Sequence, residues 1–239
     1  MTAQPELLAH HCGEAGLTEK AVGYWLKAGQ QAVARSAMTE AVAQLRRGLE
    51  LLASMPDGAD HEQRELELQA ALVPAVIAAK GYTAPEVGET IARARSLAEK
   101  LARSDYLVGL LYGECVFRLV QSELRLTLSL AKNLEQIGEA QNDRAAQLLG
   151  HHWLQGVTRH YLADLVAARA LLEPCEGLQN PTHRAFYATI TANDPYASTL
   201  AYLAMTLVLL GYIDQGRQRA NEAVSEARRL EAHTAWRRC

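Results

Sequence analysis

Aromatic residues are scarce in this chain of 239 residues: they make up 6% of it, and two of them are Phe. A core with few large rings must be filled by smaller side chains, and hydrophobic residues still reach 49%. Ala and Leu therefore supply most of the packing, which is typical of closely approaching helices. The sequence also lacks alternating runs rich in Val and Ile, so no segment competes as a β-strand. We predict an all-α fold.

The chain has no large excess of either charge and no paired cysteines. Its net charge is -3 and its pI is about 6.2, so no general attraction to nucleic acid or to an anionic membrane is expected. The cysteines are far apart and form no CxxC motif, which argues against a zinc site and favours free thiols in a reducing compartment. They are Cys12, Cys115, Cys175 and Cys239.

No segment has the composition of a signal peptide or of a membrane span. The first residues, MTAQPELLAHH, have neither a basic start nor an apolar centre. The most apolar stretch, from Leu200 to Ile213, is interrupted by Thr206 and Gly211 and is too short to cross a bilayer. We therefore expect the protein in the cytoplasm.

The stretch from Leu8 to Ala28 has the pattern of two helices joined by a tight turn. Gly16 stands where the turn needs a positive φ, and Thr18 is the predicted N-cap of the second helix. Small and large residues three or four apart share one face of each helix, which lets the helices approach closely. These residues are Leu8, Ala9, Cys12, Ala21, Trp25 and Ala28. The second helix looks long enough to serve two hairpins.

The same spacing returns at Ala41, Leu45 and Gly48, and again further along the chain. Pro74 falls within one predicted helix, where we expect a kink, and Gly81 should end that helix. A new helix should begin near Thr83, as a cap, and Pro85. We predict helices over about 5–15, 18–36, 39–53, 60–79, 83–101, 105–121, 123–138, 143–161, 164–178, 196–210 and 213–230.

Residues 177–195 are predicted to form one long irregular loop, with a short helix near 184–190 as an option. The loop is either a contact element or a plain connector. The tail HTAWRRC looks like the truncated start of a further helix, so the last apolar face is either exposed or covered by a partner.

These offsets, and their return from Gly156 to Cys175 and from Leu203 to Ala223, resemble the tetratricopeptide (TPR) repeat. The resemblance covers most of the chain. It implies a right-handed superhelical stack of antiparallel helix hairpins, a TPR-like solenoid of about 11–12 helices, with residues 1–239 forming a single solenoid.

A narrower resemblance rests on PELLAHHCGEAGLTEKAVGYWLKAGQQAVARSAMTEAVAQLRRGLELL, on GYTAPEV and on LVLLGYIDQG. These segments are similar to the helical repeats behind the AAA-type ATPase module of bacterial adenylate and guanylate cyclase-like signalling proteins. The resemblance implies that the chain is a piece of a larger multidomain protein. No GxxxxGK[ST] motif or cyclase-like set of metal-binding acids is present in the sequence, so neither activity is assigned to it.

Neither a metal site nor a catalytic site is predicted, and no cofactor is expected. The doubled histidines at 10–11 and 151–152 point in different directions on a helix, whereas two helical zinc ligands need i, i+4 spacing. No nucleophile elbow or oriented base accompanies the Ser, His and Asp residues. We predict that the chain is not an enzyme.

Binding is the better-supported role, because a stack of such hairpins lines its inner surface with the first helix of each pair. Aromatic residues and Arg make strong interface anchors. The alternative is that Trp153 and Tyr161 simply fill the core. The groove candidates are Tyr112, Val116, Arg118, Trp153, Val157, Arg159, His160 and Tyr161.

Two functional classes follow. The preferred one is an interaction and regulatory region that binds a protein or peptide segment, or upstream ATPase and cyclase domains. The alternative is a sensor that binds a small molecule or peptide in its concave groove, which a ligand-induced rise in melting temperature would reveal. A weak homodimer through the C-terminal end is a further hypothesis.

Overall fold

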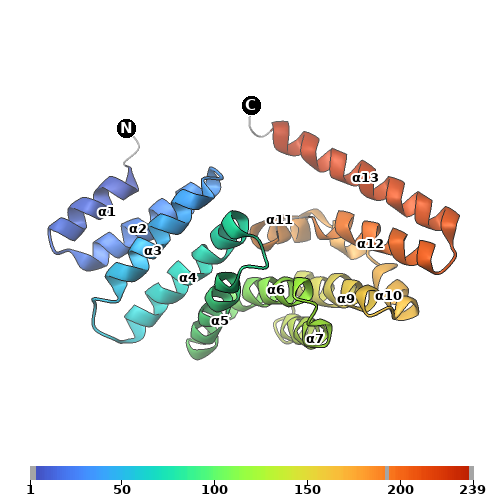
Figure 1. The fold of residues 1–239 in the computed structure, drawn as a ribbon, viewed down its shortest axis with the longest axis horizontal. Helices are drawn as coiled ribbons and strands as arrows, with labels where there is room; N and C mark the ends of the chain where they lie inside the picture. The colour runs from blue at the N-terminus through green and yellow to red at the C-terminus, as the bar shows by residue number, and fades with distance from the viewer. Residues whose placement is uncertain (1–3, 192–193, 237–239) are drawn as a thin grey trace. The chain divides into compact units, whose positions relative to one another are not determined.

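The computed structural model describes residues 4–191 and 194–236, with side chains up to residue 230, and every regular element in these ranges is a helix (Figure 1). The chain divides into two compact units, and the division falls between Leu110 and Leu111, inside α6 (Ser104–Val120). Counting α8, η1 and α9 as one continuous helix, the described residues hold twelve α-helices. The prediction of an all-α fold with 11–12 helices is confirmed.

Unit 1 is a succession of helices that each pack on the next. They are α1 (Pro5–Glu14), α2 (Thr18–Ala34), α3 (Met38–Leu52), α4 (Ala59–Lys80) and α5 (Pro85–Lys100). α2 packs on α1, on α3 and also on α4, so it serves two hairpins as the sequence predicted. Ala9, Trp25 and Ala28 form a buried cluster between α1 and α2.

Small residues bring the helices of unit 1 into close contact. A Cβ atom at Gly29 would lie 2.4 Å from Cγ of Leu45, and one at Gly48 would lie 2.8 Å from Cδ2 of Leu68. Leu45 and Leu68 are completely buried. The small-large-small spacing in the sequence is therefore a packing pattern, as predicted.

One turn geometry joins most neighbouring helices. The residue after the C-cap of the helix has a positive φ, and the N–H of the following residue donates to the carbonyl five residues before it, which is the Schellman arrangement. Its left-handed residue is Gly at two turns and a residue with a Cβ at the other five. The turns are centred on Gly16, Ser36, Ala102, Ser122, Asn142, Ala163 and Gly211.

Two predictions about helix starts are wrong. Leu17 rather than Thr18 occupies the N-cap of α2, and Ala84 rather than Thr83 occupies that of α5; neither gives a side-chain capping bond. At α2 the Schellman turn already fixes the backbone before the helix. α4 continues through Pro74 and ends at Gly81, whose φ is +82°.

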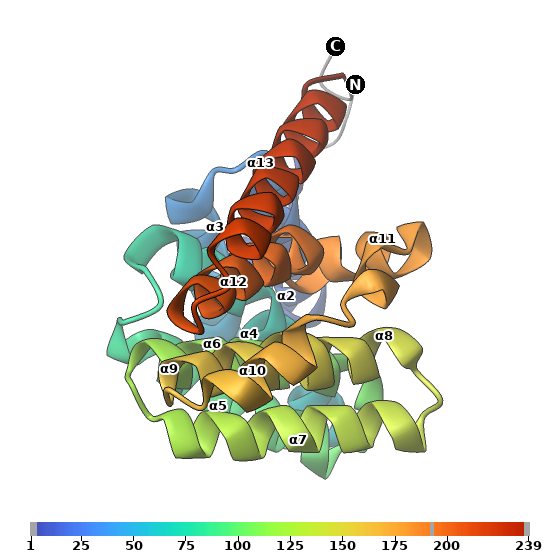
Figure 2. The ribbon, with the colours of Figure 1, turned by 90° about the vertical axis from the view of Figure 1, so that its right-hand side faces the viewer.

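Unit 2 begins in α6 and pairs its helices in the same manner (Figure 2). α7 (Leu124–Ala140) packs on a helix made of α8 (Arg144–Leu148), the π-helix η1 (Leu149–Gln155) and α9 (Gly156–Tyr161). α10 (Leu165–Leu172) follows, and α12 (Pro195–Leu209) pairs with α13 (Ile213–Trp236). The shared core of α9, α10 and α12 consists of Val157, Ala168, Leu172, Leu203 and Leu207.

The predicted loop over 177–195 is mostly helical. A 3-10 turn, η2 (Glu176–Gln179), leads into α11 (Pro181–Ile190), and residues 192–193 lie outside the described ranges. The side chain of Asn180 accepts a bond from the Thr182 N–H, and Pro181 starts the helix. Tyr187 is 1% exposed and donates its hydroxyl to the Ala145 carbonyl at 3.0 Å. This cap and this buried ring stabilise a helix where Asn-Pro suggested a loop.

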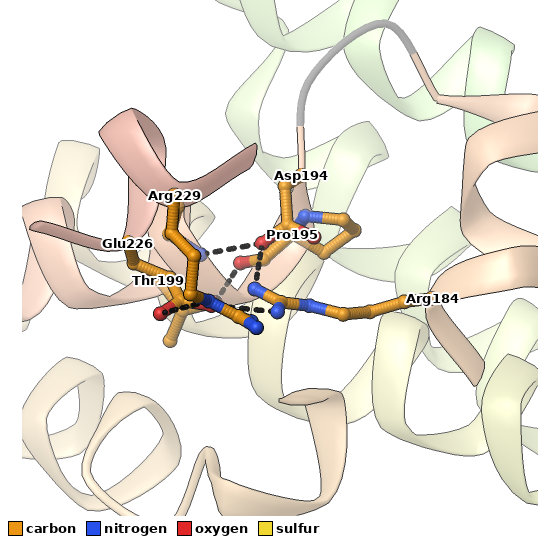
Figure 3. Close-up of polar contacts among 7 residues, drawn as sticks. Arg184, Asp194, Pro195, Thr199, Glu226 and Arg229 are labelled. Carbon is orange, nitrogen blue, oxygen red and sulfur yellow. Dashed lines mark hydrogen bonds and ion pairs between the residues drawn. The ribbon is translucent and has the colours of Figure 1, made fainter. Parts of the chain in front are cut away.

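Arg184 ties α11 to α12 and α13 (Figure 3). Its guanidinium donates to Asp194 at 2.9 Å and to Glu226 at 2.6 Å, and the three side chains are 11–18% exposed. Asp194 also caps α12 by accepting from the Ala197 N–H, and Glu226 pairs with Arg229 at 2.5 Å. One largely buried arginine side chain therefore connects three elements.

The tail does not begin a new helix, because α13 runs on to Trp236. Residues 237–239, including Cys239, lie outside the described ranges. Cys12, Cys115 and Cys175 are free thiols, and burial raises the pKa of Cys175 to about 11. Within the described residues no helix is both long and apolar enough to cross a bilayer.

Candidate functional site

Four aromatic side chains of unit 2 meet at its surface, and we call them the aromatic cluster: Trp153, His160, Tyr161 and Tyr202. Tyr202, on α12, lies 5.6 Å from the rings of Trp153 and His160 and 5.8 Å from that of Tyr161. All three pairs are edge-to-face, the favourable arrangement for aromatic rings. Sequence reasoning predicted three of the four members.

The π-helix that carries Trp153 is fixed on both sides by polar contacts. His152 Nδ1 lies 2.7 Å from the Leu171 carbonyl, and Gln155 donates to Glu135 at 2.6 Å. A Cβ atom at Gly150 would lie 2.8 Å from the Ala131 carbonyl, so this turn sits directly against α7. Wide turns of this kind are frequent at functional sites.

The hydrogen bonds of His160 show that its Nδ1 carries a proton. Thr206 Oγ1 donates its single proton to the Tyr202 carbonyl at 2.7 Å. The 2.9 Å contact between Thr206 Oγ1 and His160 Nδ1 is therefore donated by the histidine. Burial lowers the pKa of His160, which favours the neutral ring with its proton on Nδ1.

The tyrosine pair forms the exposed part of the cluster. The hydroxyls of Tyr161 and Tyr202 are 2.9 Å apart, and Tyr161 is 53% exposed. Burial raises the pKa of Tyr202, so its hydroxyl is protonated at neutral pH. Trp153 is half-buried against the core, and its indole N–H has no acceptor among the described residues. The surface offers rings and hydroxyl groups to a partner.

The two arginines among the groove candidates are already paired. Arg159 contacts Asp164 at 2.6 Å, and Arg118 contacts Glu123 at 2.9 Å. Residues 195–209, which form α12, include no charged side chain. Both arginines among the groove candidates therefore have a carboxylate partner, and α12 adds no charge to the cluster.

The other groove candidates occupy different depths. Tyr112 is 6% exposed and Val157 is 1% exposed, so both lie in the core, and Val157 belongs to the core against which Trp153 and Tyr202 pack. Val116 is half-buried on α6. Tyr161 does not fill the core, whereas Trp153 does so in part.

Sequence reasoning missed Tyr202 and an apolar stripe on α12. Gly156 and Ala204 occupy equivalent positions in two repeats. Counting from them, Met205, Val208 and Leu209 of α12 are equivalent to groove candidates of the earlier repeat. Their side chains are 45%, 45% and 64% exposed. That signal was available in the sequence. The same comparison does not predict Tyr202, because Trp153 is equivalent to the residue before Tyr202. Only the ring contacts in the structure show that Tyr202 belongs to the cluster.

Within the described residues, no three His, Cys, Asp or Glu side chains are grouped so as to hold a metal ion. The fold defined by these hairpins is a TPR-like helical repeat, and solved structures agree. One from Podosopora anserina, described as a kinesin light chain with nearly identical TPR-like repeats, has a TM-score of 0.56. It is 17% identical, and the match covers 88% of this chain and 94% of that one.

A single-substitution variant of that protein gives a TM-score of 0.57 with the same identity and coverage. No protein-family model and no curated protein matches the chain. At this identity the likeness shows the fold alone.

Proposed function

We propose that this chain is a non-enzymatic scaffold that binds a segment of another protein on the aromatic cluster. The exposure of Tyr161 carries the proposal: in a chain with 6% aromatic residues, this ring leaves 53% of its surface to solvent. Tyr and Trp are the side chains whose loss costs most at protein interfaces. Tyr161 is also pre-ordered by its hydroxyl bond to Tyr202, which lowers the entropy lost on binding.

The partner segment is expected to be apolar and uncharged. α12 presents Met205, Val208 and Leu209 beside the cluster, and the nearby arginines already have carboxylate partners. A charged side chain placed there would lose its hydration without gaining an opposite charge. An apolar segment that offers backbone carbonyls to the tyrosine hydroxyls fits this chemistry.

The proposed setting is a bacterial signalling protein with ATPase and cyclase modules in the cytoplasm. Its support is the sequence resemblance of PELLAHHCGEAGLTEKAVGYWLKAG and the segments that follow. Sequencing the gene on both sides of this segment tests the setting. Finding neither module there would contradict it and would leave the binding proposal unaffected.

Selection from a random peptide library against the full chain tests the binding proposal. We expect enriched peptides to be uncharged and apolar, and enrichment to be lost with Tyr161→Ala. The control is Tyr212→Ala, which removes a tyrosine that is 44% exposed and lies outside the cluster, against Arg169. Enrichment that survives Tyr161→Ala would contradict the proposal. A small molecule that raises the melting temperature in place of a peptide would indicate the ligand-sensing alternative.

Weak self-association through the C-terminal helices is proposed as well. Leu209, Ile213 and Val224 are 64%, 50% and 50% exposed on or between α12 and α13. Exposed apolar side chains favour association. Sedimentation over a range of protein concentrations tests it, and a monomer at all concentrations would contradict it.

A further inference from the structure

Unit 1 has a hollow between α2 and α4 that is separate from the aromatic cluster. Its volume is about 360 Å³, and it is lined by Glu19, Lys20, Gly23, Tyr24, Lys27 and Arg64. We call it the basic hollow, because three cations and one carboxylate line it. Lys20, Tyr24 and Lys27 are four and three residues apart and so share one face of α2.

The two lysines of the basic hollow have no counter-charge. Within the described residues no carboxylate lies within ion-pair distance of Lys20 or Lys27, whereas Glu19 pairs with Arg64 at 3.2 Å. Cations elsewhere in unit 1 are paired: Arg35 with Glu40, Arg46 and Lys80 with Glu86, Arg93 with Glu65, Lys100 with Glu62, and Arg103 with Asp105. The two free ammonium groups are the exception in this unit.

The floor of the hollow is open at Gly23, and its wall includes the packed ring of Tyr24. A Cβ atom at Gly23 would meet no atom within 4 Å, so this position leaves room for a ligand. The ring of Tyr24 packs against the buried cluster of Ala9, Trp25 and Ala28, and Lys27 Nζ lies 5.5 Å from its centre. The lysine ammonium is thus held over an aromatic face.

We propose that the basic hollow binds an acidic segment of a protein partner, with carboxylates between Lys20 and Lys27 and an aliphatic stem on Tyr24. Local charge complementarity selects this partner. Because the whole chain carries a net charge of -3, no long-range attraction brings anions to it. Binding must therefore depend on these side chains at close range, and salt will weaken it.

The test is a fluorescence-polarisation titration of the full chain with a labelled peptide of alternating Glu and Ala. The same peptide with Gln in place of Glu is the ligand control. We expect saturable binding of the Glu peptide, weaker binding at higher ionic strength, and none of the Gln peptide. Equal binding of both peptides, or no saturable binding, would overturn the proposal.

Two variants locate the site. Lys20→Gln with Lys27→Gln should weaken binding by about fivefold for each lysine. Gly23→Leu should weaken it at least as much as one lysine does, because a Cβ at Gly23 meets no atom within 4 Å and the larger side chain occupies the hollow without altering charge. Leu also favours a helix over Gly, so α2 should persist.

The matched control removes two positive charges from unit 2. Arg125→Gln with Lys132→Gln changes two exposed residues of α7 and should leave binding unchanged. An equal loss in this control and in the Lys20 and Lys27 variant would show non-specific attraction and overturn the proposal. Unchanged binding by Gly23→Leu would also overturn it. Neither result bears on the aromatic cluster, so the two proposals fail separately.

Discussion

Two glycines of α2 should respond in opposite ways to the same substitution. Gly23→Ala places a Cβ in open space, so the expected effect is the helix-propensity gain of about 0.5–1 kcal/mol. Gly29→Ala places a Cβ 2.4 Å from Cγ and 2.5 Å from Cδ2 of Leu45, a fully buried side chain. Carbon atoms prefer separations of about 3.5–4.0 Å, so the Leu45 side chain or the helices must shift by roughly 1 Å or more.

Such overpacking costs about 1–3 kcal/mol, and the propensity gain offsets part of it. We expect Gly29→Ala to lower the free energy of unfolding by about 0.5–2 kcal/mol. Urea unfolding followed by far-UV circular dichroism measures both variants. A thermodynamic cycle adds Leu45→Ala, which removes the colliding atoms and alone costs about 2–5 kcal/mol.

In the Leu45→Ala background, Gly29→Ala should become stabilising, because its steric conflict is gone. If Gly29→Ala stabilises the parent chain as much as Gly23→Ala does, then close helix contact is not what requires glycine there. The claim that the repeat uses small residues for close helix packing would then be wrong at Gly29, where the contact is shortest.

Three other predictions concern side chains and turns. Arg184→Leu leaves Asp194 without its ion-pair partner and Glu226 with Arg229 alone, and it should cost about 2 kcal/mol, with faster hydrogen exchange in α11 and α13. Burial lowers the pKa of His152 and of His160 below 6.5, so the unfolded chain binds protons more readily than the folded chain. The urea midpoint should therefore fall as the pH drops through and below about 6.5. Replacing both histidines by Gln should flatten this pH dependence. Ala163→Gly, at a φ of +59°, should raise the free energy of unfolding by up to about 1 kcal/mol, and no gain would contradict the strain assigned to that turn.

Much of the fold could be predicted because its signals are local. Apolar spacing located the helices, and Gly16, Gly81 and Gly211 marked turns that have φ values of +73°, +82° and +90°. Thr18 misled because a Schellman turn, once formed, leaves no cap position for it. A side-chain N-cap and a Schellman turn both fit this short segment, and only the backbone conformation distinguishes them.

The rest depended on contacts between distant segments. Tyr187 stabilises α11 through a carbonyl 42 residues away, and Tyr202 joins the cluster from a helix 41 residues beyond Tyr161. Nothing in the sequence around η1 marked a π-helix, whose wide turn is held by Gln155 and by the α7 backbone near Gly150. Spacing therefore suggested the candidate residues, and packing determined which of them are exposed.

The affinity of one selected apolar peptide for three forms of the full chain tests the central claim most directly. Fluorescence polarisation should show binding to the parent chain, a loss of about tenfold or more for Tyr161→Ala, and no change for Tyr212→Ala. Circular dichroism should show equal helicity in all three, because both tyrosines are exposed. Equal affinity of the parent and Tyr161→Ala, or an equal loss in both variants, would contradict the assignment of the aromatic cluster as the binding surface.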